Sequence, residues 1–272
     1  MALLILIFVA VFAPLISTHD PLSSMIGIEP GHLPGKPPCI PILGCEDSLH
    51  LMGLDLNGRD IFSRVIYGAR ISLGVGTASI VFATLAGGFT GLVSGYAGGW
   101  TDNILMRITD VILAFPQLLL AISFVTVFGP GLQNVLLAIS LASFPFYARL
   151  ARATVLATKN TEYIMAARAI GAGPFRIMFV QIMPHTFPTI IVQATLGLGI
   201  AILDIAALSF LGLGIQPPAA EWGRMLSEGR AYMSTSPHIV FYPGIAITIT
   251  VLAINILGNG LRDALDPRLN SY

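Results

Sequence analysis

The sequence predicts an all-α membrane protein with six transmembrane helices, on three observations. Only 10% of the 272 residues are charged and 55% are hydrophobic, with a mean hydropathy of +0.82, whereas soluble domains carry roughly 25% charged residues. Glycine, which is commoner in membrane helices than in soluble ones, occurs 28 times. Apolar runs near the roughly 17–25 residues needed to cross a bilayer recur along the chain.

Composition and motifs also exclude several functions. A net charge of zero gives no basis for a nucleic-acid partner, and two cysteines are too few for a disulfide scaffold. The chain has no GxxxxGKS or GxxxxGKT phosphate loop, no HExxH helix and no serine-histidine-aspartate grouping. We therefore predict a non-catalytic chain with no cofactor of its own. If the chain takes part in a process driven by ATP, another chain must supply that energy.

Residues 1–17 form the first predicted transmembrane helix. The stretch resembles a signal peptide in its apolarity, but it lacks a basic beginning and a small-x-small cleavage site. We therefore expect it to be retained in the membrane.

Residues 18–70 are predicted to form an extracytoplasmic loop that ends in an interfacial helix. The end of the loop is amphipathic, because Ile61, Val65 and Ile66 share one face. Three arginines on this helix are expected to reach lipid headgroups or water: Arg59, Arg64 and Arg70.

The same loop holds two cysteines and two histidines. His32, Cys39, Cys45 and His50 follow one another at spacings of seven, six and five residues, which fit no standard zinc pattern, so no metal site is predicted. A disulfide between Cys39 and Cys45 is expected instead, because extracytoplasmic compartments are oxidising. Two free thiols are the alternative.

A five-helix core is predicted over residues 71–262, followed by a cytoplasmic tail over 263–272. Its spans cover residues 72–96, 103–128, 132–153, 187–211 and 239–260. Pro116 is expected to kink the second of these spans. In the first, small residues recur at every fourth position and permit close helix packing, at Ala83, Gly87, Gly91 and Gly95.

Polar residues inside the spans are candidates for function. Asp204 and Asn255 lie in the last two spans, and a charge within the membrane is costly enough that Asp204 should face protein or water. Both residues are candidates for lining or gating a pathway, and a hydrogen bond to a neighbouring helix is the alternative for each. Asp110 is expected to pair with Arg107, one turn earlier on its helix.

The distribution of basic residues sets the expected orientation. Six spans place both termini on one side of the membrane. That side holds eight Lys or Arg against six on the other side, and against two when the long loop 18–70 is discounted. We therefore expect both termini and the loop 154–184 to be cytoplasmic.

The loop 154–184 contains an amphipathic stretch, EYIMAARAIGAGPFRIMFVQIMP, over residues 162–184. Gly171 is expected to stop a first short helix, Pro174 to start a second one, and Pro184 to end the second. Two short helices at a sharp angle, with small residues and arginines at a water boundary, indicate a surface that another protein grips.

This stretch resembles the signature loop of ABC importer permease subunits, which reads Glu-Ala-Ala, three residues, Gly, nine residues and a segment ending in Leu-Pro. Methionines replace the Glu and the Leu here. The residues at these positions are Met165, Ala166, Ala167, Gly171, Met183 and Pro184.

Two further blocks, over residues 50–76 and 204–230, are similar to the second permease subunit of dipeptide and oligopeptide importers. The resemblance covers about residues 50–268. The Pro-rich insertion over residues 29–48 departs from the family pattern.

The resemblance implies a type I ABC importer permease fold in a prokaryotic inner membrane, forming half of a pathway for di- or oligopeptides. The implied partners are a second, homologous permease subunit, two ATPase subunits that hold ATP-Mg, and an extracytoplasmic solute-binding protein. Coupling to the ATPases is expected at Glu162, Ala166, Ala167, Arg168, Gly171, Pro174, Arg176 and Pro184. The alternatives are the same machine carrying nickel, glutathione or oligosaccharides, or an ion-coupled carrier or channel.

Overall fold

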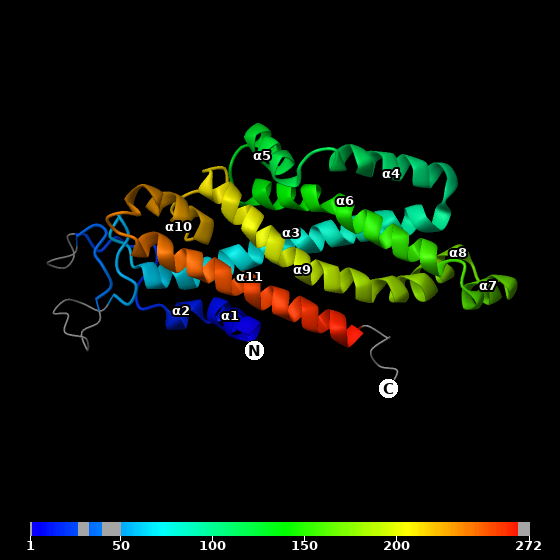
Figure 1. Ribbon diagram of the computed structural model, residues 1–272, viewed down its shortest axis with the longest axis horizontal. Coiled ribbons are helices and arrows are strands. Elements are labelled where there is room, and N and C mark those ends of the chain that lie inside the picture. The colour runs from blue at the N-terminus through cyan, green and yellow to red at the C-terminus, as the bar shows by residue number, and fades with distance from the viewer. Residues whose placement is uncertain (1, 27–32, 40–49, 266–272) are drawn as a thin grey trace. The chain divides into compact units, whose positions relative to one another are not determined.

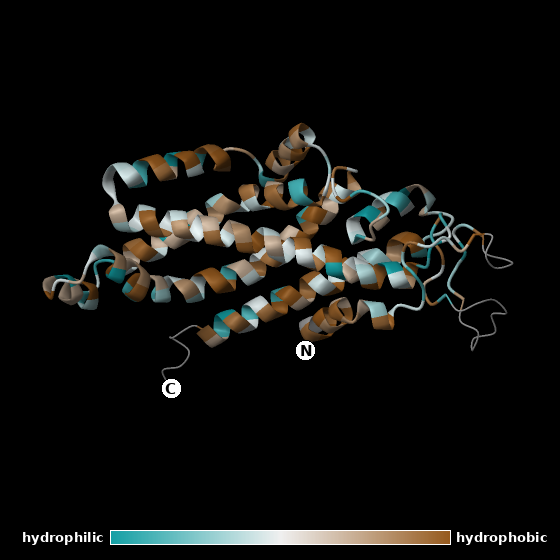
Figure 2. Cartoon of the chain, turned by 180° about the vertical axis from the view of Figure 1, so that it is seen from behind, coloured by the Kyte–Doolittle hydropathy of each residue, from teal (hydrophilic) through white to brown (hydrophobic). Residues whose placement is uncertain are grey.

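The computed structural model describes residues 2–26, 33–39 and 50–265. Most of these residues are helical, and hydrophobic residues recur along the length of the long helices (Figure 2). The chain divides into two compact units, and each is described by itself. Unit 1 comprises Met1–Thr77, Val125–Val135 and Gly199–Ile254, and unit 2 comprises Ala78–Phe124, Leu136–Leu198 and Asn255–Tyr272.

Four helices are much longer than the others (Figure 1): α3 (Ile61–Ala97), α6 (Leu132–Thr158), α9 (Met183–Phe210) and α11 (His238–Leu265). Each belongs to a helix that is long and apolar enough to cross a membrane. A fifth span is present if α4 (Gly99–Leu113) and α5 (Gln117–Phe128) count as one. The described residues therefore contain four or five such spans, and the count of six stays a prediction.

The predicted first span is divided into two short helices, α1 (Ala2–Val11) and α2 (Ala13–Ile16). Pro14 lies in the first turn of α2, where a missing N–H costs no hydrogen bond. At 1.5 Å per residue, residues 2–16 rise about 22 Å. That length is less than the ~30 Å of a bilayer's hydrocarbon core.

The kink predicted at Pro116 is confirmed, and it is large. The axes of α4 and α5 meet at 86° across the short break that contains this proline. A proline removes one backbone donor and disfavours helical geometry in the residue before it. The predicted span 103–128 is therefore a bent helix pair.

One helix replaces two predicted elements at the start of the core. The interfacial helix and the following span were expected to meet near residue 70, but α3 runs through that position without a break. No proline occurs between Ile61 and Ala97, so nothing interrupts the hydrogen-bond ladder. Its 37 residues rise about 55 Å, which is longer than the hydrocarbon core of a bilayer.

Five short elements complete the fold: α7 (Glu162–Ala169), α8 (Pro174–Arg176), the π-helix η2 (Ile177–Ile182), α10 (Trp222–Gly229) and the 3-10 turn η3 (Arg230–Tyr232). Contrary to expectation, Pro184 does not end a short helix. The backbone N–H of Met183 still bonds to Met178, five residues back, and the α-helical pattern starts there. The hydrogen-bond pattern thus changes from π-helical to α-helical next to Pro184, which has no backbone N–H to donate. The helix therefore continues through this proline.

Unit 1 has a hydrophobic core in which residues from α3, α9, α10 and α11 pack together. Trp222 is its largest side chain, and the indole Nε1 donates a 2.9 Å hydrogen bond to the Val65 carbonyl. A side chain at Gly68 would overlap this indole, since a methyl group built there lies 2.8 Å from the ring. The glycine therefore lets α10 pack tightly on α3.

In unit 2, α3 packs closely against α6 along its row of small residues. A methyl group built at Gly87 would lie 2.6 Å from the Phe144 carbonyl oxygen, and one at Gly91 would overlap the Ala148 carbonyl. Ala83 on the same face is fully buried. Small residues thus bring the two backbones together, where larger ones would hold them apart.

Candidate functional site

The 162–184 hairpin, made of α7, α8 and η2, lies at the end of α6 in unit 2 (Figure 1). Its inner face is apolar and buried: Ile164, Ile177 and Ile182 pack against Leu92 of α3 and Val155 of α6. This small core fixes the hairpin to the long helices.

The sharp turn in the hairpin depends on one glycine. Gly171 has a φ of +85°, which L side chains rarely adopt. Its N–H bonds to the Arg168 carbonyl, and the N–H of Ala172 bonds to that of Ala167, both at 3.0 Å. These two bonds satisfy carbonyls that the end of α7 would otherwise leave open. The sequence pattern correctly located this helix end.

The outer face of the hairpin is apolar and exposed. Ile170 and Phe175 are 87% and 75% exposed, and Met165 and Val180 are also exposed. Seven of the eight predicted coupling residues are exposed, namely Glu162, Ala166, Arg168, Gly171, Pro174, Arg176 and Pro184. Ala167 is the exception, because it is buried.

Two ion pairs link α4 to α6 in unit 2. Asp102 accepts two 2.6 Å hydrogen bonds from the guanidinium of Arg152. Asp110 pairs with Arg149 at 2.6 Å, so the expected pair with Arg107 is wrong. The contact joins α4 to α6, so it could not be predicted from the sequence of either helix alone. Asp102, Arg107 and Arg152 also line a cavity of about 680 Å³.

The two pathway candidates are both half-buried. Asp204 lies on α9 in unit 1, and Asn255 lies on α11 in unit 2. Their roles stay predictions.

Unit 1 contains a buried network of charges where solvated arginines were expected. Arg59 donates to Asp55 at 2.7 Å and to Glu228 at 2.8 Å. Arg64, only 1% exposed, lies 3.5 Å from Asp55 and 3.6 Å from Glu228. Of the three arginines on the predicted interfacial helix, only Arg70 is exposed. The prediction was wrong for the other two, because Glu228 is 169 residues from Arg59 in sequence and its proximity leaves no local pattern.

The same charges line a cavity of about 510 Å³, together with Arg224 and Tyr232. Arg224 reaches Glu228 at 3.2 Å, one helical turn along α10. Three arginines thus share two carboxylates, so the cavity wall carries an excess positive charge.

Glu221 begins α10 from a fully buried position. Its carboxylate accepts hydrogen bonds from the backbone N–H groups of Gly223 and Arg224, at 2.9 and 2.8 Å. The side chain therefore caps the helix. Burial raises the pKa of this carboxyl above its ordinary value, and the two backbone donors oppose that rise.

The cysteines and histidines of the first predicted loop are described only in part. Cys39 is buried and exchanges two backbone hydrogen bonds with His50. Its predicted partner Cys45 lies outside the described residues, as does His32. The disulfide stays a prediction.

Comparison with known proteins identifies the family. The model of the binding-protein-dependent transport system inner membrane component matches residues 87–271, more than half of the chain. The chain belongs to this family. It is a multi-pass membrane subunit of an ABC importer and is not itself an enzyme, because ATP hydrolysis belongs to partner ATPases.

Relatives of this permease subunit include dipeptide and glutathione permeases. The dipeptide transport system permease protein DppC of Alkalihalophilus pseudofirmus is 45% identical over 265 residues, covering 97% of this chain and 83% of that protein. The glutathione transport system permease protein GsiD of Pectobacterium atrosepticum is 48% identical over 224 residues, covering 82% of this chain and 74% of that protein.

A solved structure shares the fold of this permease subunit. A chain of the MetNI methionine ABC transporter, in an inward-facing conformation, matches with a TM-score of 0.61. The match covers 74% of this chain and 95% of that one, at 20% identity. It therefore shows the permease fold alone.

Proposed function

We propose that this subunit forms half of the translocation pathway for di- or oligopeptides and docks on its ATPase partners through the outer face of the 162–184 hairpin. A second, homologous permease subunit supplies the other half. Two ATPase subunits hold ATP-Mg, and an extracytoplasmic solute-binding protein delivers the cargo.

The observation that carries this proposal is the exposure of Ile170 and Phe175. Large apolar side chains exposed to this degree at the tip of an otherwise well-packed hairpin mark an interaction surface. Buried aromatic and aliphatic anchors dominate the energy of such interfaces. The hairpin can serve as the docking element because its inner core holds it firmly to α3 and α6.

The basic residues near the hairpin support its cytoplasmic placement. Arg168 and Arg176 are exposed there, and Lys159 donates to the Gly95 carbonyl at 2.8 Å. Basic residues concentrate on the cytoplasmic side of membrane proteins. Both termini then face the cytoplasm of a prokaryotic cell, and residues 50–70 and 212–238 face the solute-binding protein.

Coupling then follows from the arrangement. ATP binding closes the ATPases and displaces the hairpin, and the long helices move between inward and outward openings as packed bodies. The described part of the chain offers a largely apolar set of spans, so cargo selection falls mainly to the solute-binding protein.

A direct test replaces the exposed anchors with a charge. Ile170→Asp and Phe175→Asp should each weaken ATPase association by at least roughly 30-fold, the effect of losing about 2 kcal/mol at an interface. Co-purification of the ATPases and substrate-stimulated ATP hydrolysis measure this loss. Leu22→Asp, at an exposed apolar residue of unit 1, is the control. Full ATPase binding by both hairpin variants would overturn the docking role.

Glutathione is the second candidate cargo, since relatives of similar identity carry that name. Uptake of a labelled dipeptide into proteoliposomes, with the cognate binding protein and excess unlabelled glutathione, separates the two. Peptide import predicts uptake that vanadate blocks and glutathione leaves unchanged. Vanadate-insensitive uptake would instead indicate an ion-coupled carrier or a channel.

A further inference from the structure

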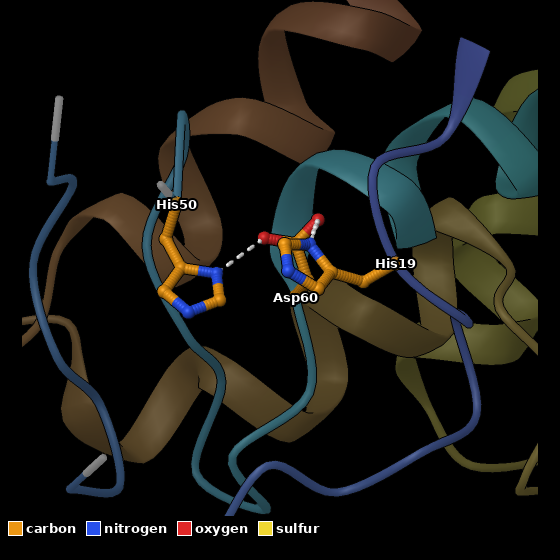
Figure 3. A group of neighbouring side chains, drawn as sticks. All are labelled: His19, His50 and Asp60. Atoms are coloured by element: carbon orange, nitrogen blue, oxygen red, sulfur yellow. Dashed lines mark hydrogen bonds and ion pairs between the residues drawn. The ribbon is translucent and has the colours of Figure 1, made fainter. Parts of the chain in front are cut away.

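Three metal-ligating side chains from separate parts of the sequence converge in unit 1: His19, His50 and Asp60. The two rings point a nitrogen at different oxygens of the Asp60 carboxylate (Figure 3). His50 Nδ1 lies 3.0 Å from Oδ1, and His19 Nδ1 lies 3.9 Å from Oδ2. One ligand atom from each residue lies within 4.8 Å of the other two.

These separations suit a small divalent metal ion. Zinc binds imidazole nitrogen and carboxylate oxygen at about 2.0–2.2 Å, so neighbouring tetrahedral ligands lie roughly 3.3 Å apart. The two nitrogen–oxygen separations, which run to different carboxylate oxygens, bracket this value. Because all three ligand atoms lie within 4.8 Å of one another, side-chain rotations would have to draw them together onto one ion. Two histidines and one carboxylate are also the protein ligands of zinc sites that keep a fourth position for water.

The surroundings of the cluster hold the carboxylate in place. Asp60 precedes α3, and its Oδ2 accepts a 2.8 Å hydrogen bond from the Ser63 N–H, while the Thr18 hydroxyl lies 3.4 Å away. Such outer contacts orient the carboxylates that bind metals.

The three side chains of the cluster differ in their exposure. His50 and Asp60 are buried, whereas the His19 side chain is 26% exposed. An ion could therefore enter from the His19 side and displace the contact between the His19 ring and Thr18, which are 2.9 Å apart.

We propose that His19, His50 and Asp60 form a zinc site that ties the segment after α2 to the start of α3. Imidazole with carboxylate favours zinc and its neighbours among transition metals over magnesium or calcium. The bound ion would close a link between residues 19 and 60, which the chain otherwise joins through a long loop. The proposal is independent of the transported cargo.

Spacing in the sequence could not reveal this cluster. The spacing of the cysteines and histidines in the first loop predicted no metal site. Of those four residues, only His50 belongs to the cluster. His19 and Asp60 are 41 residues apart and follow no metal-binding motif.

The test measures zinc bound to the assembled complex after chelator treatment and re-addition of Zn²⁺ alone. Elemental analysis should find one more zinc per permease chain in wild type than in His19→Ala. A chromophoric zinc indicator should report at least about tenfold weaker binding for the variant. His19 is chosen because its removal leaves the buried His50–Asp60 contact intact, so the metal-free complex should keep its melting temperature.

His185→Ala is the matched control, since it removes an exposed histidine outside the cluster and should bind zinc as wild type does. Co²⁺ added in place of zinc should give the visible absorption of tetrahedral nitrogen and oxygen ligation in wild type and His185→Ala but not in His19→Ala. Equal zinc content in wild type and His19→Ala would overturn the site and leave a simple hydrogen bond between His50 and Asp60.

Discussion

The 162–184 hairpin and the charged network around Arg64 use their side chains in opposite ways. The network turns its charges inward, where Arg59 and Arg64 share Asp55 and Glu228. The hairpin turns large apolar groups outward, with Ile170 and Phe175 exposed on its surface.

This difference separates a region whose charges find partners within the chain from one whose apolar face is left uncovered. A buried ion is costly unless an opposite charge lies beside it, so the three arginines of the network depend on its two carboxylates. An exposed apolar face gains stability only when something covers it. Substitutions should therefore damage folding in the first region and association in the second.

The strongest test of this contrast is Asp55→Ala. Arg59 and Arg64 would then have only Glu228 as a carboxylate partner, and removing one partner of a buried ion pair costs about 3–5 kcal/mol. We expect a large fall in the melting temperature of the purified complex. Arg70→Ala, at an exposed residue outside the network, should leave it nearly unchanged. Equal melting temperatures would show that the network contributes little to folding.

A pair of isoleucines in the hairpin provides the second test. Ile164 is fully buried and Ile170 is 87% exposed. Ile164→Ala leaves a cavity in the small inner core and should cost roughly 2–4 kcal/mol, loosening residues 162–184 locally. Hydrogen exchange of these amides should accelerate in Ile164→Ala.

The matched variant Ile170→Ala removes the same atoms without leaving a cavity. It should keep wild-type exchange and weaken only ATPase association. Faster exchange in Ile170→Ala than in Ile164→Ala would reverse the assignment of the two faces.

The smallest effect is expected at Glu221, a buried carboxyl without an arginine partner in the described residues. Because burial raises its pKa above 4.5, the native state holds this proton to a higher pH than the unfolded chain does. Its contribution to stability is therefore present at low pH and is lost as the pH rises above 4.5. Glu221→Gln should flatten the decline of the melting temperature over that range. Asp263→Asn, at an exposed carboxyl, serves as the control, and an unchanged slope in Glu221→Gln would refute the assignment.

Patterns within one helix were predicted well from the sequence. The small residues from Ala83 to Gly95, the bend at Pro116 and the stop at Gly171 each follow from a local backbone or packing rule. The outward side of the hairpin was predicted only in part, since Ala167 looked equivalent to Ala166 and differs from it only in tertiary contacts.

Features that depend on distant residues could not be predicted. Arg59 and Arg64 looked like surface residues on an amphipathic helix, because their partner Glu228 lies on α10. The cluster of His19, His50 and Asp60 was missed for the same reason. Hydrophobic periodicity identifies the apolar and polar faces of a helix, but it does not show which face another segment will cover.

The continuous helix from Pro174 to Phe210 has a mechanical consequence. On one side of Phe175 the chain passes through the turn at Gly171; on the other it enters η2 and α9 with no loop between. The tip that carries Phe175 is therefore continuous with a long apolar helix and is joined to α7 only through the turn. Under the proposed docking role, a displacement of this tip would be passed directly along α9.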